Sequence, residues 1–213
     1  MPNLPISQLP QSNLPLDGTE IFPLVQGGIT KYTTLNSLIY APGATYGVYN
    51  QTTNSTPVTN TLVESSLIDG GVGSLTIPAN LFRVGEAFHA ILTGHISCVN
   101  NHTLRIRIKA GSSILADTGL ISMALTTTKH WKLEVFFTIN QLGIAGVGSI
   151  STGGSFTYTK DASSAFEGVN FSYENNTTFN TTIDNTLSIT AQWGTADPGD
   201  SIYSNICTLI KTY

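Results

Sequence analysis

The chain has 213 residues, enough for one well-cored domain and an additional arm but short for two independent cores. Only 10% of the residues are charged, against roughly 25% in an average soluble domain, and Thr, Ser, Asn and Gly replace them. The net charge of −4 comes without a basic stripe, so the electrostatic attraction that dominates nucleic-acid binding and polybasic membrane attachment is missing. We therefore expect no nucleic acid as a partner.

The start of the chain has no charged segment followed by an apolar run, so the sequence predicts no secretory signal. No apolar stretch approaches the roughly 20 residues that cross a bilayer, so we expect no membrane insertion and a protein made and kept in a cytosol. In that compartment Cys98 and Cys207 are expected to be reduced and to pack as small hydrophobic residues.

Residues 1–40 differ from the rest of the chain because prolines recur through them and prevent a long helix. We predict an extended N-terminal arm. Within it, residues 21–24 and 28–33 are expected to form a small hairpin around Gly27 and Gly28, and residues 34–40 one short helical turn.

Residues 41–56 are polar and rich in turn formers, with Pro42 and Gly43 followed by the run from Asn50 to Thr56. This composition is typical of a linker. The main domain is therefore predicted to span residues 57–213.

Short segments of alternating apolar and polar residues recur through the main domain, and such a period of two predicts half-buried strands. The clearest are residues 88–98, 104–109, 130–139 and 186–193. Residues 202–213 would also line one helix face, but their Thr, Tyr and Ile content favours a strand. That strand has apolar residues on both faces, with Tyr203, Cys207 and Leu209 opposite Ile202, Ile206 and Ile210, which predicts a central strand or one covered by another subunit.

Roughly eight to ten such strands without intervening helices leave a sandwich, a jelly roll or a barrel as candidate architectures. Their number favours an all-β fold of two antiparallel sheets, a jelly-roll β-sandwich preceded by the extended arm. The strand order does not follow from the sequence.

Catalytic motifs are absent from the sequence, and we expect no enzyme, no cofactor and no metal. Three carboxylates, Glu134, Glu167 and Asp184, are candidates for a hydrolase pair, but no spacing places two of them across a cleft. His89 and His95 share one strand face, so a metal bridging them is conceivable, although no third ligand follows at a suitable spacing.

Two further groups of residues are candidates for ligand binding. Asp197 and Asp200 could offer oxygen ligands to Ca²⁺, but they flank Pro198 and Gly199, and turn formation explains them more simply. Aromatic side chains with one polar end suit wet sugar sites. The candidates are Tyr46, Tyr49, Tyr173, Trp193 and Tyr203, and packing in a core or interface is the ordinary alternative for each.

Two segments resemble known viral proteins. Residues 6–10 (ISQLP) and 16–31 (LDGTEIFPLVQGGITK) resemble the N-terminal module of phage tail-fibre and appendage proteins. Residues 73–80 (GSLTIPAN) and 84–88 (VGEAF) resemble the opening of trimeric jelly-roll heads in phage and giant-virus proteins, which are similar to tumour-necrosis-factor and C1q modules. Residues 191–194 and 208–213 look like the closing strands of that group.

The resemblance implies a TNF/C1q-like head in a homotrimer, with the arm bound to other virion proteins of the capsid, portal or tail. It implies a virion structural protein, assembled in the host cytoplasm, that acts as a head or tail fibre or spike and that contacts the host surface. The arm residues that carry it are Leu9, Pro10, Glu20, Phe22, Pro23, Val25 and Gln26. The alternatives are a capsid cement protein and a module that recognises a host surface glycan.

Overall fold

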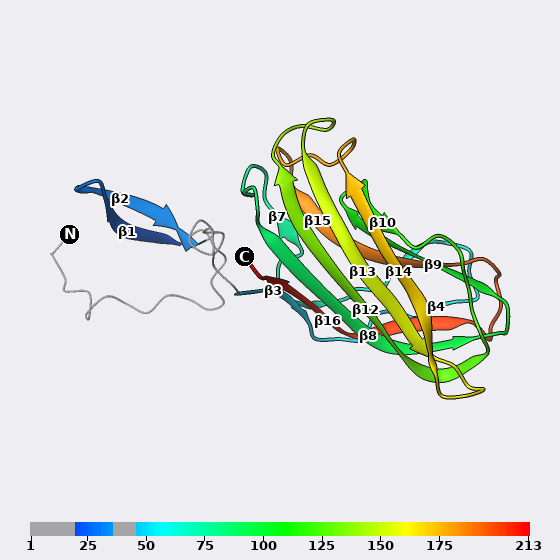
Figure 1. Ribbon diagram of the computed structural model, residues 1–213. Helices are drawn as coiled ribbons and strands as arrows, with labels where there is room; N and C mark the ends of the chain where they lie inside the picture. Colours follow the sequence, from blue (N-terminus) through cyan, green and yellow to red (C-terminus); the bar gives the residue numbers. More distant parts are fainter. Residues whose placement is uncertain (1–19, 36–45) are drawn as a thin grey trace, which may run out of the picture. The chain divides into compact units, whose positions relative to one another are not determined.

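The computed structural model describes residues 20–35 and 46–213, which belong to two compact units with their boundary between Ala41 and Pro42. The first unit contains a two-stranded hairpin and the second contains two larger sheets (Figure 1). The predictions for Leu9, Pro10 and most of the helical turn at 34–40 lie outside the described residues.

The hairpin consists of β1 (Ile21–Gln26) and β2 (Ile29–Thr34), which pair in antiparallel register from Ile21 opposite Thr34 to Gln26 opposite Ile29. Gly27 and Gly28 connect the strands with φ angles of 62° and 75°. Two consecutive positive φ angles are what a tight two-residue hairpin turn needs, and glycine adopts them without strain. The predicted hairpin is therefore confirmed.

The second unit is an antiparallel β-sandwich, which confirms the all-β prediction. Its eight-stranded sheet contains β3 (Tyr46–Gln51), β4 (Val58–Thr59), β6 (Gly71–Gly73), β8 (Ala87–Cys98), β12 (Thr126–Gln141), β13 (Ser149–Thr159), β14 (Phe166–Asn175) and β16 (Ser201–Lys211). The six-stranded sheet contains β5 (Ser65–Ser66), β7 (Thr76–Ile77), β9 (Thr103–Ala110), β10 (Ser113–Asp117), β11 (Ile121–Ser122) and β15 (Asn185–Trp193).

The chain crosses repeatedly between the two layers. After β8 it enters the six-stranded sheet for β9, β10 and β11, returns for β12, β13 and β14, and then crosses again for β15 and β16. Figure 1 shows β12, β13 and β14 running in one layer in front of β9 and β15. The narrower jelly-roll assignment of the TNF/C1q kind stays a prediction.

Alternation of side chains explains how both sheets bury one face. Along β8, every second residue from Phe88 to Cys98 is buried, while the residues that alternate with them are partly exposed. The inward residues of β9, β12 and β15 repeat this pattern and supply both tryptophans, Trp131 and Trp193, to the core. The period of two in the sequence therefore predicted these strands correctly.

Strand β16 lies between β8 and β3, as predicted for a central strand. Its register with β8 shifts between Ser204 and Ile206, where the strand contains a bulge. The extra residue moves the side chains beyond it to the other face. Ile202 is consequently buried on the same face as Cys207 and Leu209, while Ile206 is 49% exposed on the other. The predicted grouping of Ile202 with Ile206 and Ile210 was wrong for this reason.

The predicted linker at 41–56 was also wrong in its second half. Strand β3 begins at Tyr46 and pairs with β16 and β6, so the sandwich starts well before Pro57. Val48 and Tyr49 are buried there. The turn-rich run that follows concealed this short strand, and only residues 52–57 form a connecting loop within the described part of 41–57.

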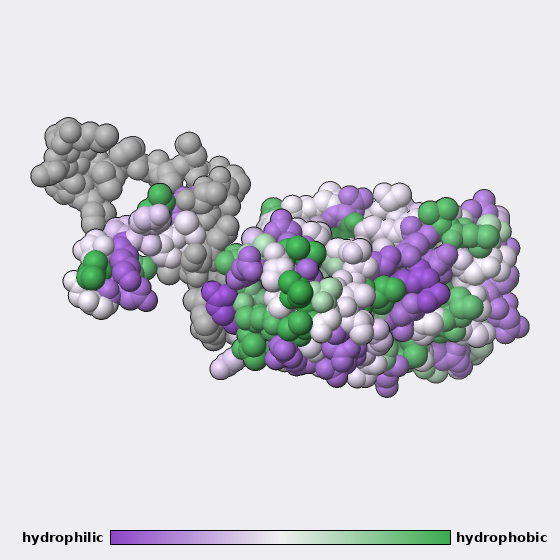
Figure 2. All heavy atoms as spheres, turned by 90° about the horizontal axis from the view of Figure 1, so that it is seen from above, coloured by the Kyte–Doolittle hydropathy of each residue, from purple (hydrophilic) through white to green (hydrophobic). Residues whose placement is uncertain are grey.

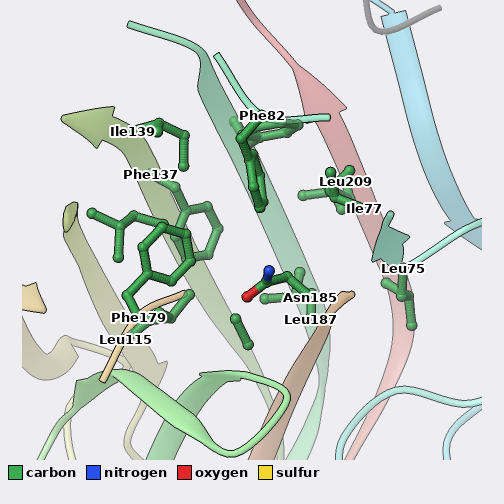
Figure 3. Close-up of a pocket in the computed structure, with 13 residues that line it drawn as sticks. Leu75, Ile77, Phe82, Leu115, Phe137, Ile139, Phe179, Asn185, Leu187 and Leu209 are labelled. Carbon is green, nitrogen blue, oxygen red and sulfur yellow. The ribbon is translucent and has the colours of Figure 1, made fainter. Parts of the chain in front are cut away.

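A cavity of about 40 Å³ remains between the sheets at one end of the sandwich. Figure 3 shows Phe82, Leu115, Phe137 and Phe179 directed toward it, with Asn185 as the polar side chain in its wall. The amide of Asn185 is occupied, since Nδ2 donates to the backbone oxygens of Asn180 and Ile183, each at 2.8 Å. The space is small and apolar, so we interpret it as imperfect packing that stays dry.

Candidate binding surfaces

The hairpin exposes apolar side chains on both faces, with Phe22 and Ile29 on one face and a larger group on the other. Residues directly opposite one another in an antiparallel pair share a face, so Ile21, Pro23 and Val25 lie on the same side as Tyr32. Ile21, Val25 and Tyr32 are 67%, 72% and 73% exposed. We call this largely exposed surface the hairpin face.

The predicted docking residues divide between the two sides of the hairpin. Pro23 and Val25 lie on the hairpin face, whereas Phe22 and Gln26 lie on the opposite side, where Gln26 accepts a hydrogen bond from Lys31 at 3.2 Å. Glu20 precedes β1, and its backbone oxygen accepts from the amide of Leu35. Sequence reasoning missed Ile21 and Tyr32, although counting the alternation through the Gly27–Gly28 turn would have found both.

The outer face of the eight-stranded sheet carries a group of apolar side chains over β8, β12 and β16, with Glu134 of β12 directly opposite Ile91. We call it the isoleucine patch, and it consists of Ile91, Phe136, Ile206 and Ile210. Phe136 and Ile206 are 51% and 49% exposed. Threonines lie among them, because Thr208 is opposite Ile91 and Thr93 is opposite Ile206.

Two charged residues of β12, Lys132 and Glu134, lie in the cross-strand rows of the isoleucine patch and are paired with each other. Glu134 accepts hydrogen bonds from Lys132 at 2.7 Å and from His89 at 2.9 Å, and the imidazole of His89 stacks on Phe136 with ring centroids 4.4 Å apart. The hydrogen bond from Lys132 and, to a lesser degree, that from His89 lower the pKa of Glu134. The patch therefore presents little net charge to a partner.

The outer face of the six-stranded sheet is charged instead. Arg105, Arg107 and Lys109 project from β9, and they pair with Asp117 and Glu64 in a connected network. Burial raises the pKa of Asp117, but the hydrogen bonds and charge of Arg105 outweigh it, so this pKa is lowered. A face that satisfies its own charges in this way is suited to water.

A polar groove lies at the end of the sandwich where β12 turns into β13 and β14 ends. It is open to solvent, has a volume of about 530 Å³ and is lined by Asn140, Gln141, Gly146, Val147, Ser149, Glu174 and Asn176. Three side chains are amides, and the lining includes no cationic group.

The surface seen in Figure 2 mixes hydrophilic and hydrophobic residues, with a larger hydrophobic cluster at the left end of the sandwich.

The two histidines of β8 do not form a metal site together. Six residues of strand separate them by about 20 Å at the usual rise of roughly 3.3 Å per residue, so a single ion cannot bridge His89 and His95. His95 instead faces His130 across the sheet with ring centroids 4.5 Å apart, and His89 is bonded to Glu134. In residues 20–35 and 46–213, no group of three or more His, Cys, Asp or Glu is arranged to hold a metal.

The remaining acidic candidates are engaged in separate local interactions. Asp197 accepts from the amide of Gly199, as expected for a turn, while Asp200 is fully buried and accepts from the amide of Val99 and from His102. Glu167 binds Lys160 and Tyr158, and Asp184 accepts from the amide of Ala79 at 2.9 Å. The geometry brings none of these carboxylates together with Glu134.

The aromatic candidates for sugar binding lie in different environments. Trp193 and Tyr49 are buried, and their polar atoms donate to backbone oxygens of Val58 and Asp69. Tyr46 lies beneath the ammonium of Lys211, and Tyr203 stacks against His95. Tyr173 is 46% exposed on β14 and remains open to a ligand.

Both cysteines are buried and free. Burial raises the pKa of each thiol to about 12, so neither is a reactive nucleophile.

Comparisons with protein-family models, with curated proteins and with solved structures found no match to this chain. No helix among the described residues is long and apolar enough to cross a membrane.

Proposed function

We propose that this protein is a structural component of a virus particle, a head or tail fibre or spike whose N-terminal arm docks on other virion proteins. The observation that carries the proposal is the hairpin face. The hairpin belongs to the first compact unit and not to the sandwich, and its hairpin face leaves Ile21, Val25 and Tyr32 largely exposed. Contiguous exposed apolar residues of this kind mark protein interaction sites.

The proposal includes a homotrimer of the sandwich. The isoleucine patch supports it, because obligate interfaces are apolar and depleted of charge. Identical surfaces that carry uncompensated charge repel one another, whereas here Lys132, Glu134 and His89 are already paired. The charged outer face of the six-stranded sheet is the surface that we expect to face water.

The direct test is mass spectrometry of virus particles purified from the source of the sequence. We expect the chain among the structural proteins at a fixed copy number, and its absence from washed particles would refute the proposal. A low copy number in multiples of three indicates a fibre. A copy number matching the capsid lattice indicates the cement-protein alternative.

The hairpin face is tested separately by adding purified chain to particles stripped of it. We expect the unmodified chain to rebind and a V25D/Y32D variant to fail. The matched control is K31D, since Lys31 is exposed on the opposite side of the same hairpin. Equal rebinding of all three chains would show that the hairpin face is not the docking surface.

A further inference from the structure

The polar groove at the β12–β13 turn has the properties of a built binding site. Two of its lining residues, Ser149 and Glu174, are joined by a hydrogen bond of 3.0 Å from Oγ to Oε1. One carboxylate oxygen of Glu174 is thereby oriented, and the other stays available. Ser149 is itself buried, so this hydrogen bond anchors Glu174 to the sandwich.

Both rims of the groove are fixed by buried side chains. On one side, the loop carrying Gly146 and Val147 is held by Thr181, whose amide donates to the backbone oxygen of Gly143 and whose Oγ1 accepts from the amide of Gly143, each at 2.9 Å. On the other side, buried Asn175 accepts from the amides of Thr177, Thr178 and Phe179. Asn176 therefore stands on a rigid turn, and a ligand meets a preorganised rim.

The polar groups of the groove are underused by the protein itself. Asn140 donates to Ser151 at 2.6 Å, whereas the amides of Gln141 and Asn176 are exposed and make no side-chain hydrogen bond within the described part of the chain. An amide offers two donors and an acceptor, and a carboxylate offers acceptors, which together match the adjacent hydroxyl groups of a sugar. Val147, 46% exposed, offers an apolar contact for the C–H face of a ring.

The lining also excludes other ligand classes. It contains no Lys, Arg or His to attract phosphate, sulfate or a carboxylate, and Glu174 repels them. Its predominantly polar walls do not suit a lipid.

We propose that this groove binds a neutral saccharide through Gln141, Glu174 and Asn176. The inference goes beyond the proposed virion role and stands without it, because the purified chain is sufficient to test it. It differs from the expectation based on aromatic residues, since Tyr173 is not part of the groove lining.

The test is binding of labelled full-length protein to an array of neutral, sialylated and sulfated oligosaccharides, followed by titration calorimetry with the strongest neutral binder. We expect neutral glycans to bind and the N176A and Q141A variants each to weaken binding roughly tenfold, because each loses hydrogen bonds to the ligand. The matched control is N170A, an exposed asparagine of β14 outside the groove, which should bind as the unmodified chain does.

Three outcomes would overturn the proposal. If no glycan binds, the groove is not a saccharide site. If sialylated or sulfated glycans bind preferentially, the ligand is not a neutral saccharide. Loss of binding in Y173A with full binding in N176A moves the site to the aromatic residue of β14. None of these outcomes affects particle incorporation or native mass, so failure here is distinguishable from failure of the virion role.

Discussion

A buried ion pair links two residues from distant parts of the sandwich. Lys211 at the end of β16 and Glu86 before β8 have side chains that are 0% and 3% exposed, with Nζ and Oε1 2.8 Å apart. Glu86 also accepts from the amide of Arg83 at 2.9 Å. The pair thus ties the C-terminal strand to the turn that opens β8.

Replacing Lys211 by Met should lower the free energy of unfolding by about 3–5 kcal/mol, because a buried carboxylate is left without its partner. Urea denaturation at neutral pH measures this. K132M, which breaks an exposed pair with Glu134, is the control and should cost less than about 1 kcal/mol. The double variant E86Q/K211M should recover much of the loss, and an equal effect of K211M and K132M would contradict the interpretation.

The charged network on β9 predicts sensitivity to acid. The pKa of Asp117 is lowered from 3.8 in the folded chain, where the hydrogen bonds from Arg105 outweigh burial. A group with a depressed folded pKa stabilises the fold above its unfolded pKa, and this contribution disappears as the pH falls through the folded value. The contribution of Asp117 is therefore complete above its unfolded pKa of about 4 and is lost progressively as the pH falls from there through the lowered folded pKa.

The D117N variant should accordingly lose less stability between pH 6 and pH 3 than the unmodified chain, as measured by urea denaturation at both values. The loss of stability between pH 6 and pH 3 should be smaller in D117N but not zero, because Glu64 has a lowered pKa in the same network. Parallel losses in the two proteins would show that Asp117 does not contribute to acid sensitivity.

At the scale of elements, the close approach of β16 to β8 at Gly94 leaves no room for a side chain. A Cβ added at Gly94 would stand 1.9 Å from the backbone oxygen of Tyr203, beside the bulge of β16. Trp131 secures the same place by donating through Nε1 to the oxygens of His95 and Tyr203. The backbone must move for any larger residue to fit.

The G94A variant should therefore lose roughly 1–3 kcal/mol or more in the free energy of unfolding. G153A on β13 is a matched control, because a Cβ there meets nothing closer than 4.0 Å. Thermal and urea unfolding of both variants should separate them clearly. Equal stabilities would mean that β16 shifts without cost.

The period of two in the sequence predicted the long strands, but it cannot predict features that depend on pairing between distant segments. Residues 88–98 and 130–139 alternate cleanly and were assigned correctly. The bulge in β16 depends on its pairing with a distant strand. The inclusion of β3 in the sheet also depends on distant partners, since β6 follows it by at least 20 residues and β16 by more than 150. The local sequence of β3 and of β16 therefore predicts neither feature.

The candidate sites divide in the same way. The hairpin face follows from alternation around two glycines, and the sequence contains all of it. The polar groove joins the end of β12, the turn before β13 and the end of β14, and only the folded sheet brings these together. Trp193 and Tyr49 were candidates by residue type, but burial removed them because type alone does not fix which face a side chain occupies.

At the scale of the whole molecule, the assembly is the property to measure. We expect light scattering to give a trimer mass for the full chain and for residues 42–213 alone, since the isoleucine patch belongs to the second unit. An I206K variant should be monomeric, because three buried lysines at an apolar interface lack partners. The matched control is I183K, whose isoleucine is 54% exposed away from the patch. If the full chain is a trimer and residues 42–213 are a monomer, the arm and not the isoleucine patch drives assembly. If the full chain is also a monomer, the trimer is refuted. The groove and the hairpin face can then still be tested on a single chain.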